Sequence, residues 1–332
     1  MAENTDSLLT RFYYNVKPFV PRGVRWALRR NRAAGIRERS SDIWPINEAA
    51  GMTPCGWQGW PDGRQFALVL THDVESKEGV NKVKNLAELE MRAGVRSSFN
   101  FIPEGGYFVP EDLRVWLIEK GFEVGVHDLY HDGKLYRSRS AFKSNAQLIN
   151  QYLRTWGATG FRSGFMLRQL EWLHDLNVDY DASTFDTDPF EPQSDGCRTI
   201  FPFFVPKPNQ QDGSGYVELP YTLPQDSTLY LLLRERSAEI WLRKLDWIAK
   251  QGGLALINIH PDYMDFDKSD FSSLRYPVSL VEELLDYVRN RYRDQFWNPL
   301  PKDLALWYRE SHCGGSKPPD STQGYEDLFP IL

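Results

Sequence analysis

Residues 65 to 293 alternate between short apolar runs and longer amphipathic stretches, and this alternation constrains the fold more than any other feature of the chain. The runs at 66–71 and 254–260 are mainly apolar, which is typical of strands buried on both faces. The stretch 140–156 has apolar residues at helical spacing, and Gly157 follows it as a stop signal. Repeated strand–helix units favour a parallel sheet, either an open α/β sheet or a barrel.

The same reading predicts the remaining elements. Strands are expected at 66–71, 97–102, 122–127, 161–163, 178–183, 216–219 and 254–260. Helices are expected at 23–39, 79–93, 110–121, 140–156, 170–176, 238–250 and 280–293. Residues 190–216 are rich in Pro, Gly and Asp, so a loop is expected there.

Composition divides the chain into three parts. Residues 1–60 form a basic and aromatic N-terminal extension with a linker that is rich in Gly, Pro and Trp. Residues 61–312 carry the strand–helix alternation and are expected to form the main folded domain. Residues 313–332 form a C-terminal tail rich in Gly, Pro and Ser at its start.

The charge of the chain excludes some classes of partner. A net charge of -6 and a pI of about 5.6 argue against nucleic acid as the main partner.

No apolar run approaches the ~20 residues of a membrane span, and no secretory signal is visible, so a cytoplasmic protein is expected. The three cysteines are widely spaced and suggest neither a disulfide framework nor a zinc ribbon.

Residues 1–40 differ from this acidic average. They hold nine of the 39 Lys and Arg residues but three of the 45 Asp and Glu residues. One interpretation is peripheral contact with the inner face of a membrane, with aromatic side chains on the surface and arginines on lipid phosphates. The alternative is a helix that caps the main domain and exposes its arginines to solvent.

Four of the six histidines lie at or just beyond the end of a predicted strand, namely His72, His127, His131 and His260. The carboxyl ends of parallel strands are where α/β sheets and barrels place their sites. His127 and His131 are four residues apart, so a helical turn after the strand would put both imidazoles on one face. Two imidazoles and a carboxylate are suitable ligands for zinc or a similar divalent ion.

Asp73 and Glu75 follow the first predicted strand. In an extended segment, residues i and i+2 point to the same side, so both carboxylates can face one cavity. One of them could bind a metal while the other acts as a base. The alternative is an acidic cluster at the start of a helix, stabilised by the helix dipole.

Taken together, these residues resemble the polysaccharide deacetylases of carbohydrate esterase family four, the NodB-homology domain. The family has five short motifs in a fixed order, and the resemblance covers about residues 65–265. The matching segments are Thr71-His72-Asp73-Val74-Glu75, His127 with His131, Phe161-Arg162-Ser163-Gly164, Tyr180 to Asp186, and Leu256 to His260. The first segment departs from the commonest pattern, because Val74 stands where a second Asp is usual. It is similar instead to the Asp-x-Asp or Asp-x-Glu branch.

The resemblance implies a distorted (β/α) barrel of about seven parallel strands with an N-terminal helical extension. It implies a metal-dependent hydrolase that removes an acetyl group, preferably N-acetyl, from a sugar or a glycan intermediate. The basic, aromatic residues 1–40 suggest a lipid-linked glycan as that substrate. Glu75, His127 and His131 would hold the metal, with Zn²⁺ first and Co²⁺, Ni²⁺, Mn²⁺ or Fe²⁺ as alternatives.

The resemblance also implies roles for the remaining site residues. Asp73 would be the base, Arg162 would keep Asp73 ionised, and His260 would be the acid. A cationic His260 needs a carboxylate beside it, and the sequence offers Asp181 and Asp186 without deciding between them.

Two other functions stay open. Cyclic-amide hydrolysis of the allantoinase type is compatible with the same fold and metal site. A degenerate site that only binds glycan is the second alternative, because Val74 occupies the usual ligand position.

Overall fold

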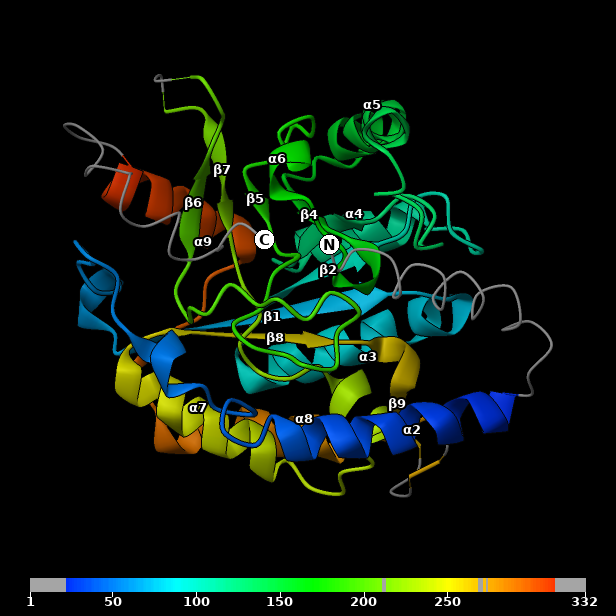
Figure 1. Ribbon diagram of the computed structural model, residues 1–332, viewed down its shortest axis with the longest axis vertical. Helices are drawn as coiled ribbons and strands as arrows, with labels where there is room; N and C mark the ends of the chain where they lie inside the picture. The colour runs from blue at the N-terminus through cyan, green and yellow to red at the C-terminus, as the bar shows by residue number, and fades with distance from the viewer. Residues whose placement is uncertain (1–21, 211–212, 268–270, 273, 314–332) are drawn as a thin grey trace, which may run out of the picture.

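The computed structural model describes residues 22–210, 213–267, 271–272 and 274–313 (Figure 1). The expectations for residues 1–21, and for the C-terminal tail beyond residue 313, lie outside the described residues. No helix in the described part of the chain is both long enough and apolar enough to span a membrane.

Within the described residues, the centre of the fold is a nine-stranded sheet in which eight strands run parallel and β6 is antiparallel to β7. The sheet order is β11-β1-β2-β3-β4-β5-β7-β6, and β8 pairs with the other side of β1. The strands are β1 (Phe66–Val74), β2 (Ser97–Phe101), β3 (Glu123–His127), β4 (Gly160–Arg162), β5 (Tyr180–Asp181), β6 (Phe203–Pro206), β7 (Gly215–Glu218), β8 (Leu254–Ile259) and β11 (Phe296–Trp297).

The sheet curls until its two sides meet. Beyond β7 the chain continues to Leu223, which forms a parallel bridge with Ile257 of β8. The seven strands β8, β1, β2, β3, β4, β5 and β7 therefore enclose a distorted barrel. This confirms the expected α/β fold with an N-terminal helix.

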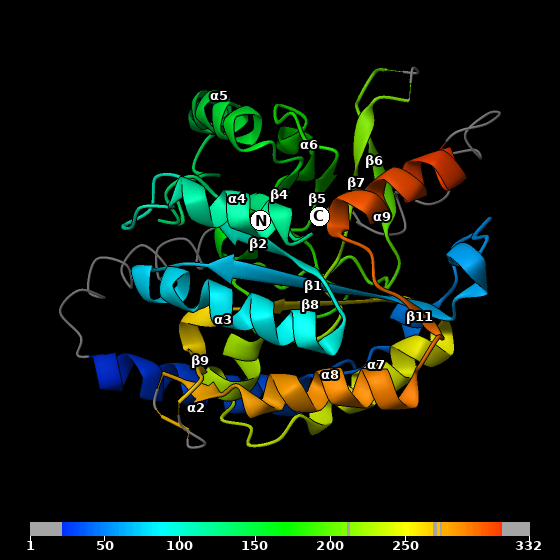
Figure 2. The same ribbon diagram turned by 180° about the vertical axis from the view of Figure 1, so that it is seen from behind.

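Helices cover the outside of the barrel. In Figures 1 and 2, α3 (Lys77–Ala93), α7 (Glu239–Gln251) and α8 (Ser279–Arg291) lie on one side of β1 and β8. The helices α4 (Glu111–Glu119) and α5 (Arg139–Trp156) lie on the other side, together with the short α6 (Leu170–Leu173). The N-terminal α2 (Arg22–Arg39) runs along the first layer and contacts η5 (Ser227–Leu232), a π-helix.

Local signals explain why the predicted helices form where they do. Ser76 and Ser138 cap the starts of α3 and α5, and each hydroxyl accepts a backbone N–H three residues on. Gly94 and Gly157 end these helices in the left-handed conformation that glycine adopts without steric cost. Most elements that were not predicted are short or irregular, and they include β6, η5, β11, the pair β9 (Met264–Asp265) and β10 (Tyr276–Pro277), and α9 (Pro301–Tyr308).

The chain has 11 tryptophans, and packing explains the presence of several of them. Trp57 packs edge-on against Trp60 with ring centroids 4.8 Å apart, and Trp307 lies 5.2 Å from Trp60. Trp297 joins the same cluster, 5.3 Å from Trp307. These rings contact the side chains that fill the barrel, so they stabilise the fold.

Candidate active site and metal centre

The candidate site lies where the parallel strands end. Asp73 is the second-to-last residue of β1, and His127 and Arg162 end β3 and β4. Glu75 and His260 directly follow β1 and β8. Because these strands are neighbours and run in the same direction, residues distant in sequence meet at one end of the barrel.

The register of β1 decides which of its residues reach this site. Ala67 and Val69 pack inside the barrel, whereas Leu68 and Leu70 pack against the helices. Asp73 continues the inward series, and Glu75 lies on the same side. His72 and Val74 belong to the outward series, as the bond from the His72 ring to Glu90 of α3 and the core contacts of Val74 indicate. Val74 is therefore a core residue. Asp73 and Glu75 are the residues of this motif whose carboxylates face the site.

Glu75, His127 and His131 form a cluster that could hold a metal ion, with all ligand atoms within 4.8 Å of one another. The Glu75 Oε1 atom lies 3.3 Å from His131 Nε2 and 3.9 Å from His127 Nε2. Nitrogen and oxygen ligands of a tetrahedral ion, each about 2.1 Å from it, stand ~3.4 Å apart. His127 Nε2 is buried and has no hydrogen-bond partner among the described residues. The donor set and its spacing therefore fit a divalent cation.

Neighbouring groups fix the orientation of these side chains. Tyr263 donates a hydrogen bond of 2.9 Å to Glu75 Oε2, which leaves Oε1 directed at the histidines. The Asp262 carboxylate accepts the backbone N–H of Glu75 at 3.0 Å and the hydroxyl of Ser76. The His127 Nδ1 atom lies 3.1 Å from the carbonyl of Arg162, so Nε2 is the nitrogen available for a metal.

His131 reaches the cluster by a loop and not by the helical turn that its spacing suggested. Asp128 and His131 adopt left-handed backbone angles, with φ of 57° and 54°, and these reverse the chain after β3. Gly164 allows the close approach of this loop, because a Cβ there would lie 2.4 Å from Asp128 Oδ2 and 2.7 Å from His131 Cδ2. Phe165 then stacks on His131, with ring centroids 4.4 Å apart.

Asp73 is buried and held by two amide side chains. Asn100 of β2 donates to Asp73 Oδ1 at 3.0 Å, and Asn258 of β8 donates to Oδ2 at 2.7 Å. Arg162 Nη1 lies 3.6 Å from Oδ2, close enough for an ion pair. Burial raises the pKa of the Asp73 carboxyl, but the charges of His127, Arg162 and His260 and the hydrogen bond from Asn100 together lower it by more, so its pKa falls well below the usual range. Asp73 is therefore ionised at neutral pH.

His260 has a dedicated carboxylate partner, Asp226. The His260 Nδ1 atom lies 2.6 Å from Asp226 Oδ1, and the His260 backbone N–H donates to Oδ2 at 2.8 Å. Tyr276 donates a further bond of 2.8 Å to Oδ2. Burial lowers the pKa of the His260 imidazole, but Asp226, together with Glu75 and Asp73, more than offsets burial, and the pKa rises to about 10. The His260 Nε2 atom faces the metal cluster, 3.8 Å from Glu75 Oε1.

This geometry corrects the expectation that Asp181 or Asp186 supports His260. Asp181 accepts bonds from the backbone and hydroxyl of Ser183, at 2.9 and 2.8 Å. Asp186 pairs with the buried Lys244, whose Nζ lies 3.0 Å from Oδ1. Asp181 is thus held by the loop after β5 and Asp186 by Lys244 of α7, whereas His260 is bonded to Asp226.

The structure therefore brings together Asp73, Glu75, His127, His131, Arg162 and His260, and adds polar residues that the sequence analysis missed. Asn258 could have been found, because it lies two residues before His260 on a strand and shares its face. Asp226 and Tyr263 carry no such signal, since they come from irregular segments between predicted elements.

Comparison with solved structures identifies the fold. The chain is similar to a candidate polysaccharide deacetylase from Mycobacterium smegmatis, with a TM-score of 0.59, 16% identity, and coverage of 81% of this chain and 99% of that one. A carbohydrate esterase domain of a multidomain xylanase from the hindgut metagenome of Trinervitermes trinervoides has a TM-score of 0.41, 13% identity, and coverage of 73% and 90%. A peptidoglycan deacetylase from Bacillus subtilis has a TM-score of 0.43, 11% identity, and coverage of 75% and 96%.

No model of a known protein family matches the chain, and no curated protein matches it in sequence. The last two structural likenesses are too weak to support an argument about this chain. The first establishes that the chain has the fold of that Mycobacterium smegmatis protein, as the order of its motifs implied. What the site does must be argued from its own residues.

Proposed function

We propose that the protein is a metal-dependent carbohydrate deacetylase that hydrolyses the amide bond of an N-acetylated sugar. One observation carries the proposal. The ionised Asp73 and the cationic His260 both border the ligand set Glu75, His127 and His131, with Asp73 Oδ2 3.9 Å from His127 Nδ1 and His260 Nε2 3.8 Å from Glu75 Oε1. Hydrolysis of an amide needs this combination: a base for water, an acid for the leaving nitrogen, and a group that stabilises the carbonyl oxygen.

The ligand set supports a divalent cation, with zinc as the first choice because two imidazoles and one carboxylate are a common set in catalytic zinc sites. Bound by Glu75, His127 and His131, the ion would lower the pKa of a water ligand and polarise the acetyl carbonyl.

Asp73 accepts the proton of the attacking water. Its low pKa does not prevent this, since the water is itself made more acidic at the site. Asn100 and Asn258 hold both oxygens of the Asp73 carboxylate in place, and Arg162 stabilises its charge. A base whose orientation is already fixed lowers the entropic part of the activation barrier.

His260 donates a proton to the leaving nitrogen. Asp226 keeps the imidazole protonated at neutral pH and fixes Nδ1, so that Nε2 carries the proton toward the reacting bond. Without this proton, the departing amine would leave as a strongly basic anion.

The test separates metal binding from catalysis. Metal content is measured by mass spectrometry of the purified protein, and turnover is measured on N-acetylated and O-acetylated oligosaccharides. In Asp73→Asn, we expect full metal occupancy with loss of activity. In His127→Ala, we expect loss of both. Unchanged turnover in Asp73→Asn would exclude its role as base, and full occupancy in His127→Ala would exclude the metal assignment.

The same assay distinguishes the alternatives. A panel of cyclic ureides tests cyclic-amide hydrolysis, and turnover of these compounds without turnover of acetylated sugars would replace the proposal. Protein that binds no metal, even with added zinc, and that binds oligosaccharide without cleaving it would support a glycan-binding module.

A further inference from the structure

The residue before Asp226 also contacts the site. Gln225 is buried and belongs to the segment that leads into η5. Its Oε1 atom accepts a hydrogen bond of 3.0 Å from Asn258 Nδ2, and the same nitrogen donates to Asp73 Oδ2 at 2.7 Å. Two consecutive residues therefore serve the two proton-transfer groups, since Asp226 binds the acid and Gln225 binds the amide that holds the base.

The side-chain amide of Asn258 is held in one orientation by its two acceptors. An amide has two N–H groups on its nitrogen and an oxygen that only accepts. Turning the Asn258 amide over would set its oxygen against Asp73 Oδ2 and Gln225 Oε1, which are both acceptors. Because Asn258 is fully buried, water is not at hand to replace the lost hydrogen bonds. Gln225 thus helps to fix the N–H group that Asn258 offers to Asp73.

Glu191 fixes the orientation of Gln225 in turn. The Gln225 Nε2 atom donates to Glu191 Oε1 at 2.6 Å, and the Tyr221 hydroxyl lies 3.1 Å from the same oxygen. Turning the Gln225 amide over would set its oxygen against Glu191 Oε1 and its nitrogen against Asn258 Nδ2. Glu191 therefore decides which end of the Gln225 amide faces Asn258.

The backbone that carries Gln225 is anchored to the barrel. The Leu223 N–H donates to the carbonyl of Leu256 at 3.0 Å, and the Trp241 indole of α7 donates to the carbonyl of Pro224 at 2.7 Å. Leu223 also forms the bridge to β8 that closes the barrel. The position of Gln225 is therefore set by the contacts that close the barrel.

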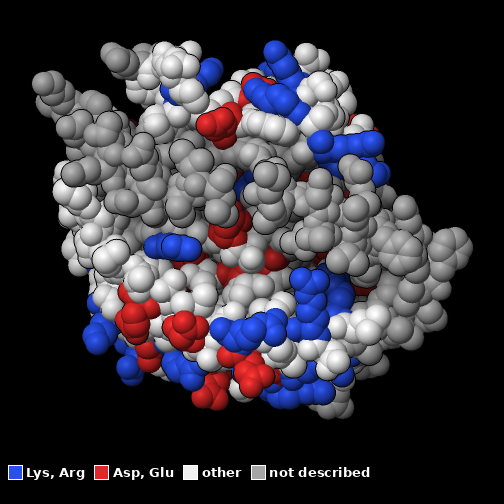
Figure 3. Space-filling model, in the orientation of Figure 1, with Lys and Arg blue, Asp and Glu red and all other residues white. Residues whose placement is uncertain are grey.

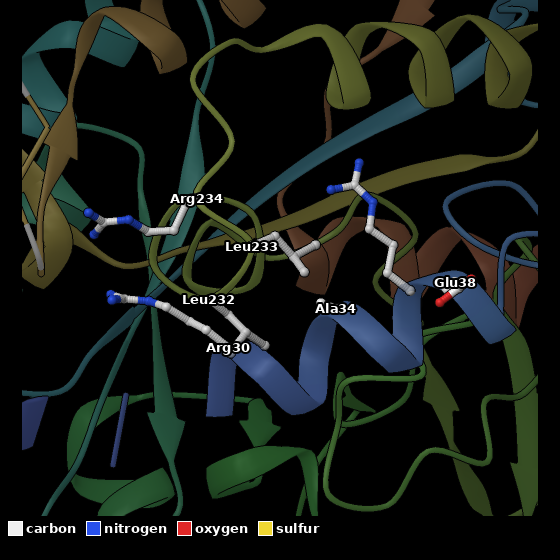
Figure 4. Close-up of a pocket in the computed structure, with 7 residues that line it drawn as sticks. Arg30, Ala34, Glu38, Leu232, Leu233 and Arg234 are labelled. Atoms are coloured by element: carbon white, nitrogen blue, oxygen red, sulfur yellow. The ribbon is translucent and has the colours of Figure 1, made fainter. Parts of the chain in front are cut away.

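Helix α2 supports the part of the chain that follows. Arg30 Nε donates to the carbonyl of Leu231 in η5 at 3.3 Å, and Arg37 pairs with Glu235 at 2.5 Å. Figure 4 shows the end of η5 beside α2, with a cavity of about 320 Å³ between them. In Figure 3, Lys and Arg side chains gather over α2, with Asp and Glu interspersed. The N-terminal helix therefore packs on the segment that follows Gln225 and helps to hold it.

We propose that Gln225 is a positioning residue for the base: it orients Asn258, and Asn258 keeps Asp73 directed at the attacking water. The inference rests on the proposed function, because the orientation of Asp73 affects a rate only if Asp73 takes part in the reaction. A misdirected base changes substrate binding little but raises the activation barrier, so the effect falls on kcat more than on KM.

The kinetic test is a double-mutant cycle on the metal-loaded full chain. Gln225→Met keeps the length of the side chain and removes both polar ends. We expect it to lower kcat at least about fivefold, with KM within about twofold of the wild type and metal content unchanged. In the Asn258→Ala background the same substitution should lower kcat by less than about twofold, because the residue through which Gln225 acts is already absent. Equal losses in the two backgrounds would overturn the proposal.

Gln65→Met is the matched control. Gln65 directly precedes β1, at the end of that strand opposite Asp73, and its Nε2 atom donates to the carbonyl of Ala249 at 2.9 Å. The substitution removes the same kind of hydrogen bond away from the site, so kcat should stay at the wild-type value. A loss of kcat equal to that of Gln225→Met would show a general effect of such substitutions and would overturn the positioning role.

A spectroscopic measurement does not depend on turnover. The side-chain amide protons of Asn258 are observed by NMR after ¹⁵N-asparagine labelling and are assigned by their loss in Asn258→Ala. In the wild type we expect both protons to exchange slowly with water, and in Gln225→Met we expect one of them to shift and exchange faster. Rapid exchange of both protons in the wild type would overturn the proposal. Absence of turnover on every acetylated sugar would instead refute the proposed function, and the spectrum would still decide whether Gln225 orients Asn258.

Discussion

The partner of His260 gives the sharpest test of the proposed chemistry. Replacing Asp226 by Asn removes the charge that holds the His260 imidazole in its protonated form, while the size of the side chain is kept. The substitution also preserves an acceptor for the backbone N–H of His260 and for the hydroxyl of Tyr276. We therefore expect the variant to fold and to bind metal, but to lose its acid at neutral pH.

The size of the effect follows from the pKa. The His260 pKa of about 10, against an ordinary value of 6.5, corresponds to ~5 kcal/mol in favour of the protonated form. Asp226 is the largest cause that raises this pKa, ahead of Glu75 and Asp73. If the pKa falls to about 6.5, only ~3% of His260 is protonated at pH 8, and kcat drops about 30-fold. At pH 5.5 about 90% is protonated, so most of the activity returns.

The assay is the pH profile of kcat from pH 5.5 to pH 9, with metal content measured for each variant. The wild type should keep its activity toward alkaline pH, because His260 has a pKa of about 10 and loses its proton only near that pH. The variant should lose activity above about pH 6.5. Tyr276→Phe is the matched control, since it removes one hydrogen bond to Asp226 but keeps the carboxylate. An unshifted alkaline limb in Asp226→Asn with metal retained would refute the acid assignment.

Two predictions concern stability. Burial raises the pKa of Glu123 to about 7, so its stabilising contribution is complete below the unfolded-state pKa of about 4.5 and is lost as the pH rises through 7. In urea unfolding experiments, the unfolding free energy of the wild type should therefore fall by ~2–3 kcal/mol from pH 5 to pH 8. Glu123→Gln should not show this fall. An equal fall in the wild type and the variant would contradict the prediction. Lys244→Met strands the buried Asp186 carboxylate and should lower the unfolding free energy by ~3–5 kcal/mol, with partial recovery when Asp186→Asn is added. A loss below about 1 kcal/mol would mean that Asp186 finds another partner.

The sequence was sufficient where a local pattern determines a side chain's direction. The alternation of β1 predicts that Asp73 and Glu75 share a face, and the structure places both on the inner side of the strand. The long helices α3 and α5 were predicted within two residues, because serine caps and glycine stops coincide with their apolar periodicity.

The sequence was insufficient where the backbone or the contact is unusual. The helical turn considered for His131 does not form, because Asp128 and His131 take left-handed angles, which are uncommon for any residue other than glycine. The bond between His260 and Asp226 joins residues 34 positions apart through the irregular segment that leads into η5. Such a contact depends on tertiary packing and produces no periodic pattern in the sequence.

The alternation of β1 has a consequence for how related chains can differ. Loss of a single residue within β1, ahead of His72, would rotate Asp73 and Glu75 toward the helices and turn Val74 into the barrel, although every residue of the motif would still be present. Insertions and deletions ahead of the motif are therefore tolerable only in pairs or outside the strand. Spacing measured from the start of β1, more than the identity of the residue beside Asp73, is the feature to compare among such chains.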